Sequence, residues 1–144
     1  MCAKIIQERR QRIWYDPDVL VFHHRRPVFR PHLRQLRRYA EHRGYFVKRY
    51  PANSLELAYF LPAILVLVLG LGWWPALAWP WWWRGYEVML QCYLGAVLLT
   101  AARSLSWRMT CAIATGLIAS HVTYGLFFLK GLLSRRLPDE PPRA

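Results

Sequence analysis

Hydrophobic residues fill most of the chain after residue 55, in three stretches with almost no charge. Residues 57–78 and 109–129 contain no Asp, Glu, Lys or Arg, and residues 86–102 contain only Glu87. A helix over the first stretch would be roughly 33 Å long at about 1.5 Å per residue, which is enough to cross a membrane. The pattern predicts a transmembrane region over residues 55–133 with about three helices, and hence a lipid bilayer as partner.

The first 54 residues are polar and strongly basic. They hold 13 of the 20 Lys and Arg residues and four of the eight Asp and Glu residues. Because cations collect on the cytoplasmic side, this arm is predicted to be cytoplasmic in a multi-pass protein of the cell membrane. Three crossings place the tail 134–144, predicted to be disordered, outside, although Arg135 and Arg136 favour the opposite side.

Within the arm, the pattern predicts a helix, a strand and a second helix, so the chain as a whole is mostly α. The segment from Asp16 to Asp18 is a turn because Pro17 disfavours helix before it. The apolar run from Val19 to Phe22 is typical of a strand in a covered sheet. Pro31 suits the first turn of the second helix, and Gly44 suits its C-terminal cap. Nothing else in the arm is predicted to pair with the strand, which indicates either a missing partner or a missing N-terminal segment.

The second helix has two stripes at helical spacing. The apolar stripe consists of Leu33, Leu36 and Ala40. The polar stripe consists of Gln35, Arg38, Tyr39 and His42. Arg binds phosphate oxygens in a planar fork, Gln both donates and accepts hydrogen bonds, and an aromatic ring stacks on a sugar. The polar stripe is therefore a candidate binding face for a sugar and a phosphate; the alternative is an ordinary solvated helix face.

His23 and His24 follow the predicted strand. Adjacent side chains on a strand point to opposite faces, so the two histidines are poorly placed to bind one metal ion together. One imidazole at a strand end is a common metal ligand, and the alternative is a structural histidine. Both residues are candidate metal ligands.

The order of these segments resembles the end of a membrane-bound family-2 glycosyltransferase. The resemblance rests on "YDPDVLVFHHRR", on "PHLRQLRRYAEHRG" and on the apolar segments that follow. Gln35 to Tyr39 is similar to the QxxRW motif of that family, with Tyr39 in the place of Trp, and "HVTYGLFFLKGLL" resembles its last membrane helix. The resemblance implies a fold in which the C-terminal end of an α/β GT-A domain precedes the transmembrane helices.

The resemblance also implies an activity, namely inverting transfer of a sugar from a nucleotide sugar to a membrane-proximal, lipid-linked or glycan acceptor. It assigns substrate binding to Arg25, Gln35, Arg38 and Tyr39. The family's DxD motif and catalytic base are expected upstream of Met1, so the chain is expected to be a C-terminal fragment that is inactive alone. A separate N-terminal half is one way to supply them. No cofactor is expected on this chain alone, whereas Mg²⁺ or Mn²⁺ is implied for the full-length enzyme.

A second interpretation remains open, in which the chain is not an enzyme. A small multi-pass membrane protein can use a basic arm to bind anionic lipid headgroups, since each cation near such a surface contributes about 1 kcal/mol. The net charge of +12 also permits nucleic-acid binding. The membrane segments make nucleic acid an unexpected partner.

Overall fold

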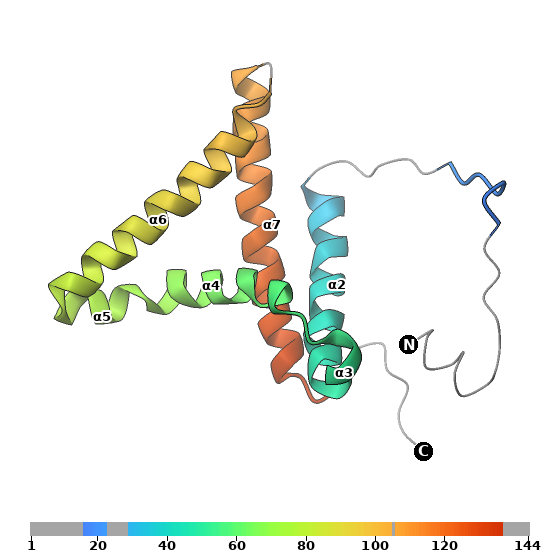
Figure 1. Cartoon of the computed structure of the whole chain (residues 1–144), viewed down its shortest axis with the longest axis horizontal. Coiled ribbons are helices and arrows are strands. Elements are labelled where there is room, and N and C mark those ends of the chain that lie inside the picture. Colours follow the sequence, from blue (N-terminus) through green and yellow to red (C-terminus); the bar gives the residue numbers. More distant parts are fainter. Residues whose placement is uncertain (1–15, 23–28, 105, 137–144) are drawn as a thin grey trace.

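The computed structural model describes residues 16–22, 29–104 and 106–136 (Figure 1). This part of the chain is mostly helical, which confirms the predicted mostly α class. Its helices are α2 (Arg30–Arg49), α3 (Pro51–Ser54), the 3-10 helix η1 (Leu57–Tyr59), α4 (Leu61–Leu71), α5 (Trp73–Ala78), α6 (Pro80–Ala101) and α7 (Trp107–Leu133).

The predicted strand over Val19–Phe22 is wrong. These residues belong to the described part, form no strand, and are between 64% and 92% exposed. A strand needs a neighbour to pair with its backbone, and no described segment supplies one. The turn before it is confirmed, because the Asp18 backbone N–H donates to Asp16 Oδ1 at 3.0 Å. The first predicted helix lies outside the described residues.

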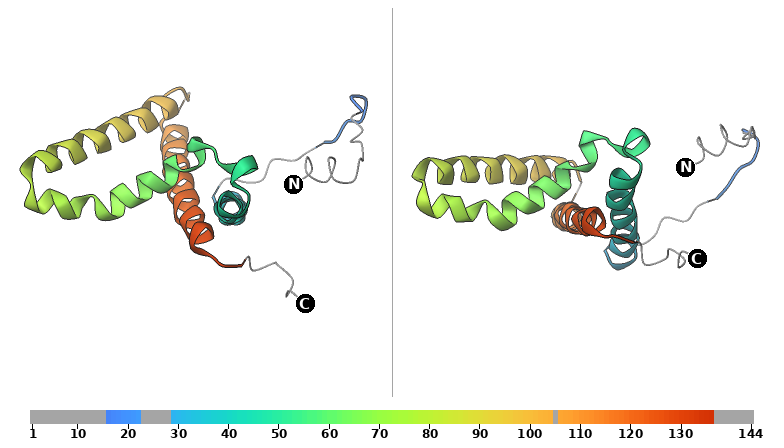
Figure 2. Two further views of the ribbon diagram at one scale, coloured as in Figure 1. Left: turned by 60° about the horizontal axis from the view of Figure 1, so that its bottom comes forward. Right: turned by 90° about the horizontal axis from the view of Figure 1, so that it is seen from below.

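Helices α2 and α7 lie side by side and run in the same direction, as the views in Figures 1 and 2 agree. Near the start of α2, His32 Nε2 lies 3.3 Å from Ser120 Oγ. At the other end, Lys48 Nζ donates to the carbonyl oxygen of Ser134. The C-terminal ends of the two helices are therefore next to each other.

The core lies where α2, α4 and α7 meet, around Phe128. This side chain is fully buried and packs with Ala40, Val47 and Ala63. The ring of Phe60 meets it edge to face, with 5.1 Å between the ring centroids. A Cβ atom on Gly125 would overlap the carbonyl oxygen of Pro62, so α4 crosses α7 in direct backbone contact.

Helices α4 and α5 lead away from this core, and α6 returns to the start of α7 (Figure 1). The indole N–H of Trp82 donates to the Gly72 carbonyl oxygen at 2.8 Å and fastens α6 to the end of α4. Farther along, Tyr93 OH lies 3.1 Å from His121 Nδ1 and links α6 to α7. These contacts make α4, α5 and α6 a single extended hairpin-like unit anchored on α7.

Two segments are long and apolar enough to cross a membrane. They are Leu57–Pro75, with mean hydropathy 2.0, and Trp107–Leu133, with mean hydropathy 1.6. They correspond to the first and third of the three predicted crossings. The middle one, residues 86–102, lies in α6, does not meet the same criteria, and stays a prediction.

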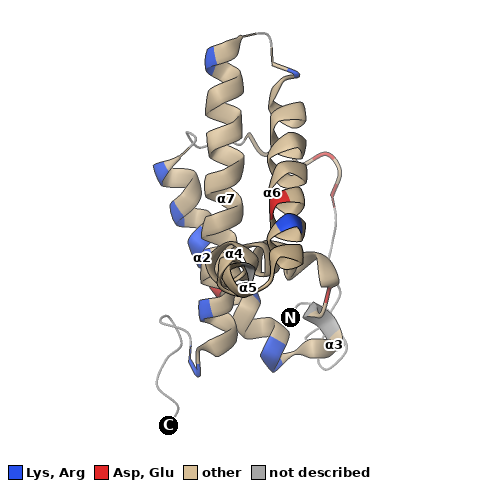
Figure 3. Cartoon of the chain, turned by 90° about the vertical axis from the view of Figure 1, so that its left-hand side faces the viewer, with Lys and Arg blue, Asp and Glu red and all other residues tan. Residues whose placement is uncertain are grey.

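The packing of the described residues fits a lipid environment. Only seven hydrophobic residues in the described part are buried, far fewer than a soluble domain of this size needs. Large apolar side chains along α4, α6 and α7 are exposed, including Leu61, Leu99 and Leu133. Lys and Arg residues lie mainly on α2 and near helix ends (Figure 3). An exposed apolar surface of this extent is typical of contact with lipid or with another protein.

Candidate functional site on helix α2

Helix α2 combines a strong apolar stripe with an unusually basic surface. Pro31 lies in its first turn, where a missing backbone N–H costs nothing, and Lys48 and Arg49 lie in the last turn, where cations favour the helix dipole. Its seven cations are Arg30, Arg34, Arg37, Arg38, Arg43, Lys48 and Arg49. Its one acidic residue is Glu41.

The inner face of α2 is held in backbone contact with α7 by two glycines. A Cβ atom on Gly44 would overlap the carbonyl oxygen of Phe128, and one on Gly131 would overlap that of Glu41. The predicted role of Gly44 as a C-terminal cap is wrong, because α2 continues to Arg49 and buries Gly44 against α7. The close packing against α7 compensates for the low helix propensity of glycine.

The predicted apolar stripe of α2 is confirmed. Ala40 is completely buried, and Leu33 and Leu36 are half-buried. Beside this stripe, the guanidinium of Arg37 lies 4.4 Å from the ring centroid of Phe127 on α7. These contacts fix the rotation of α2 about its own axis and so determine which of its residues face outward.

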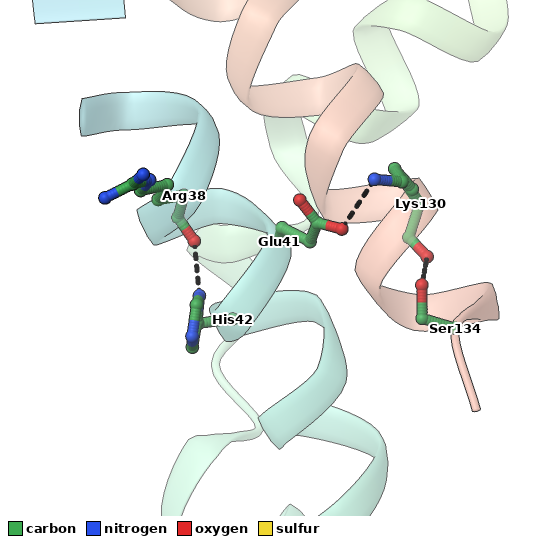
Figure 4. A network of polar contacts seen from close by, with 5 residues as sticks. All are labelled: Arg38, Glu41, His42, Lys130 and Ser134. Atoms are coloured by element: carbon green, nitrogen blue, oxygen red, sulfur yellow. Dashed lines mark hydrogen bonds and ion pairs between the residues drawn. The ribbon is translucent and has the colours of Figure 1, made fainter. Parts of the chain in front are cut away.

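The acidic residue of α2 is neutralised by α7. Lys130 Nζ lies 2.7 Å from Glu41 Oε1, and the Glu41 side chain is only 8% exposed. Figure 4 shows Glu41 turned toward α7 and Arg38 turned away from it. The outer face of α2 therefore carries cations without a compensating carboxylate.

Two polar side chains of the predicted stripe lie on that outer face. Gln35 and Arg38 are exposed, and their side chains form no hydrogen bond or ion pair with the described residues. One turn after Arg38, His42 Nδ1 lies 2.8 Å from the carbonyl oxygen of Arg38. This contact holds the His42 imidazole against the backbone of α2. Gln35 and Arg38 are one turn apart and present amide and guanidinium donors toward the same side.

Tyr39 is separated from the rest of its predicted stripe. Arg43 Nη2 donates to Tyr39 OH at 2.8 Å, and the Arg43 guanidinium lies 4.1 Å from the ring centroid of Tyr59. The Tyr39 ring is 6.3 Å from that of Tyr124 on α7. The hydrogen bond to Tyr39 raises the pKa of Arg43 above its ordinary value. The structure keeps Gln35 and Arg38 on one face of α2, whereas Tyr39 contacts Arg43 and Tyr124.

The remaining predicted site residues, His23, His24 and Arg25, lie outside the described residues. Within the described ranges, no three His, Cys, Asp or Glu residues are grouped so that they could hold a metal ion. The predicted metal ligands therefore stay predictions.

Sequence reasoning did not find the residues that orient the site. Only one feature of the sequence indicates the ion pair between Glu41 and Lys130, namely that Glu41 is the single carboxylate in a helix with seven cations. Gly131 gives no such signal, because its role depends on how closely two helices distant in sequence approach each other. The contact of Arg43 with Tyr59 likewise depends on the path of η1.

Comparisons of the chain with family models, curated proteins and solved structures found no match.

Proposed function

We propose that this chain is the membrane part of a glycosyltransferase that moves a sugar from a nucleotide sugar to a membrane-proximal or lipid-linked acceptor. The observation that carries the proposal is the outer face of α2. There Gln35 and Arg38 are exposed and unpaired with any described residue, while the opposite face of the helix is locked against α7. The resemblance of Gln35 to Tyr39 to QxxRW supports the same role.

In this proposal Arg38 binds the diphosphate of the donor. When the acceptor hydroxyl attacks the anomeric carbon, the sugar–phosphate bond breaks and negative charge grows on the departing diphosphate. A planar guanidinium pairs with two phosphate oxygens and stabilises that charge. Gln35 hydrogen-bonds sugar hydroxyls. The base that accepts the hydroxyl proton belongs to a nucleotide-sugar-binding domain that works with this chain.

The proposal differs from the family pattern in two roles. Tyr39 OH accepts a hydrogen bond from Arg43. The proposal therefore gives Tyr39 a supporting role on the side of α2 that meets the acceptor, and does not assign it stacking against a sugar ring. The described residues contain no group of metal ligands, and no step is assigned to a metal here.

A second candidate function is binding of anionic lipid headgroups by α2. The observation that favours it is the charge of the helix, seven cations against one carboxylate that Lys130 neutralises. Under this interpretation the affinity for headgroups depends only on the number of positive charges on α2, so replacing one Arg by Lys leaves that affinity unchanged. The transferase proposal differs because it requires the fork geometry of Arg38.

The proposed activity is tested in membranes from the natural host, where any partner domain is present. Labelled nucleotide sugars are added to membranes with the chain deleted and with the chain restored, and label in the lipid extract is counted. We expect one nucleotide sugar to give label that disappears on deletion and returns on restoration. Equal labelling of both membranes with every donor would rule out the transferase role and leave lipid binding.

We further propose a topology of two crossings, Leu57–Pro75 and Trp107–Leu133, with both ends cytoplasmic. One contact supports this topology: Lys48 at the end of α2 donates to Ser134 just after α7, so the chain before the first proposed crossing lies next to the chain after the last one. In this topology α6 does not cross the membrane. This arrangement also moves Arg135 and Arg136 to the cytoplasmic side, where cations are favoured.

Reporter fusions test this topology. Fusions after Ser54, Arg84, Ser104 and Ala144 should be cytoplasmic, external, external and cytoplasmic. Three crossings give a cytoplasmic reporter after Ser104 and an external one after Ala144, so these two positions decide between the alternatives.

A further inference from the structure

Helix α6 packs against the rest of the molecule with one side only. On that side Tyr93 OH lies 3.1 Å from His121 Nδ1 of α7, and both Val97 and Ala101 are buried. Tyr93, Val97 and Ala101 follow one another at a spacing of four residues, so they share one face of the helix. The opposite side of α6 is therefore its outer face.

The outer face of α6 consists of Val88, Gln91, Gly95, Leu98 and Ala102, which recur every three or four residues. The same alternation of three and four residues forms the contact line between two paired helices. Val88 and Leu98 are 58% and 55% exposed, and Gln91 is exposed as well. A Cβ atom on Gly95 would meet no atom within 4 Å, so the backbone there is open to a neighbour.

Gln91 is the feature of this face that needs a partner. No Asp, Glu, Lys or Arg lies between residues 88 and 102. The hydroxyl groups of the same stretch have partners, because Tyr93 OH contacts α7 and Thr100 Oγ1 donates to the Ala96 carbonyl oxygen at 2.8 Å. The amide of Gln91, by contrast, forms no hydrogen bond with the part of the chain that the structure describes.

Neither water nor lipid suits the whole of this face. Water would hydrate Gln91 but leave Val88 and Leu98 exposed. Lipid would cover those two side chains but leave the Gln91 amide without a hydrogen-bond partner. Helix α4 differs, because none of its residues has a polar side chain and lipid alone can cover it. The outer face of α6 is instead suited to a protein surface that is apolar around one amide-binding group.

A second copy of this chain provides such a surface. In a dimer with twofold symmetry the same patch pairs with itself, so a residue on the axis meets its own counterpart. A primary amide both donates and accepts, so two Gln91 side chains can exchange two hydrogen bonds across the axis. A single polar residue in an otherwise apolar contact line also fixes the register of two paired helices.

We propose that two copies of this chain associate through the outer face of α6, with their Gln91 amides hydrogen-bonded to each other across the twofold axis. Val88 and Leu98 pack on either side of this pair, and Gly95 lets the two backbones approach closely. The dimer is independent of the proposed transferase activity and of whether α6 crosses the membrane.

The test measures the dimer dissociation constant of the full chain in mild detergent by analytical ultracentrifugation at several protein-to-detergent ratios. Gln91→Leu keeps a side chain of similar size and removes the hydrogen bonds. Gly95→Leu adds bulk to the outer face. Gly85→Leu is the matched control, because a Cβ atom there also meets no atom within 4 Å, whereas Gly85 belongs to the side of α6 that faces Val68 of α4.

We expect the unmodified chain to be a dimer. Gln91→Leu should weaken the dimer about tenfold although it makes the face more apolar, because the paired amides are lost. Gly95→Leu should weaken it about tenfold or more by overpacking the contact, and Gly85→Leu should leave it unchanged. A monomeric unmodified chain, a dimer insensitive to either Gln91→Leu or Gly95→Leu, or equal weakening by Gly85→Leu overturns the proposal.

Discussion

Replacing Gly131 by Ala is expected to separate α2 from α7. The added Cβ atom would overlap the carbonyl oxygen of Glu41 and lie close to its Cα atom, and neither backbone atom can rotate away. Overpacking of this kind costs about 1–3 kcal/mol. Hydrogen exchange of the α2 amides should therefore accelerate about tenfold or more, because 1.4 kcal/mol is a factor of ten. Exchange is measured by mass spectrometry on the full chain in detergent.

Gly95→Ala is the matched control. It makes the same change in the middle of a helix, at a position where a Cβ atom meets nothing within 4 Å. Ala is favoured over Gly in a helix by about 1 kcal/mol, so this variant should be slightly more stable than the original chain. The two substitutions are thus expected to act in opposite directions. Unchanged exchange of α2 in the Gly131 variant would show that the two backbones are not in contact.

Replacing Arg38 by Lys is expected to reduce sugar transfer at least about tenfold, which corresponds to about 1.4 kcal/mol of transition-state stabilisation. The substitution keeps the positive charge but removes the planar fork that pairs with two phosphate oxygens. Arg38 forms no ion pair with the described residues, so its loss should leave the fold intact. The measurement is the initial rate of label transfer in native membranes that carry the variant.

Arg34→Lys provides the control for charge. Arg34 is also exposed and unpaired with any described side chain, and it lies one turn before Arg38 on the same helix. It is outside the polar stripe, so its replacement should change the transfer rate less than about twofold. Arg37 is a poorer control, because its guanidinium packs over the ring of Phe127 and supports the docking of α2.

Local patterns predicted much of the fold. The helix after Pro31, its apolar stripe through Ala40 and the turn at Pro17 depend on neighbouring residues, and all three are present in the structure. The two segments that are long and apolar enough to cross a membrane, Leu57–Pro75 and Trp107–Leu133, are recognised by length and hydropathy, which are also local properties.

The failed predictions depend on contacts between distant segments. An apolar run such as Val19–Phe22 becomes a strand only with a partner, and none of the described residues provides one. Gly44 has the local signal of a helix end, but the approach of α7 gives it a packing role inside the helix.

The site was predictable only in part, for the same reason. Spacing placed Gln35 and Arg38 on one face, and the structure keeps them there. Spacing also placed Tyr39 on that face, but a hydrogen bond from Arg43 and the nearby ring of Tyr124 hold it elsewhere. Side-chain direction at the border of a helix face is decided by neighbours on other elements, which periodicity does not reveal.

The ratio of transfer rates between the Arg38→Lys and Arg34→Lys variants tests the proposed role of α2 most directly. Both are measured in native membranes lacking the original chain, at equal amounts of restored protein. The transferase proposal predicts a ratio of about one tenth or less, because only Arg38 contacts the diphosphate. A ratio near one, with both rates equal to that of the unmodified chain, would contradict it and leave α2 as a helix that binds lipid headgroups by charge alone.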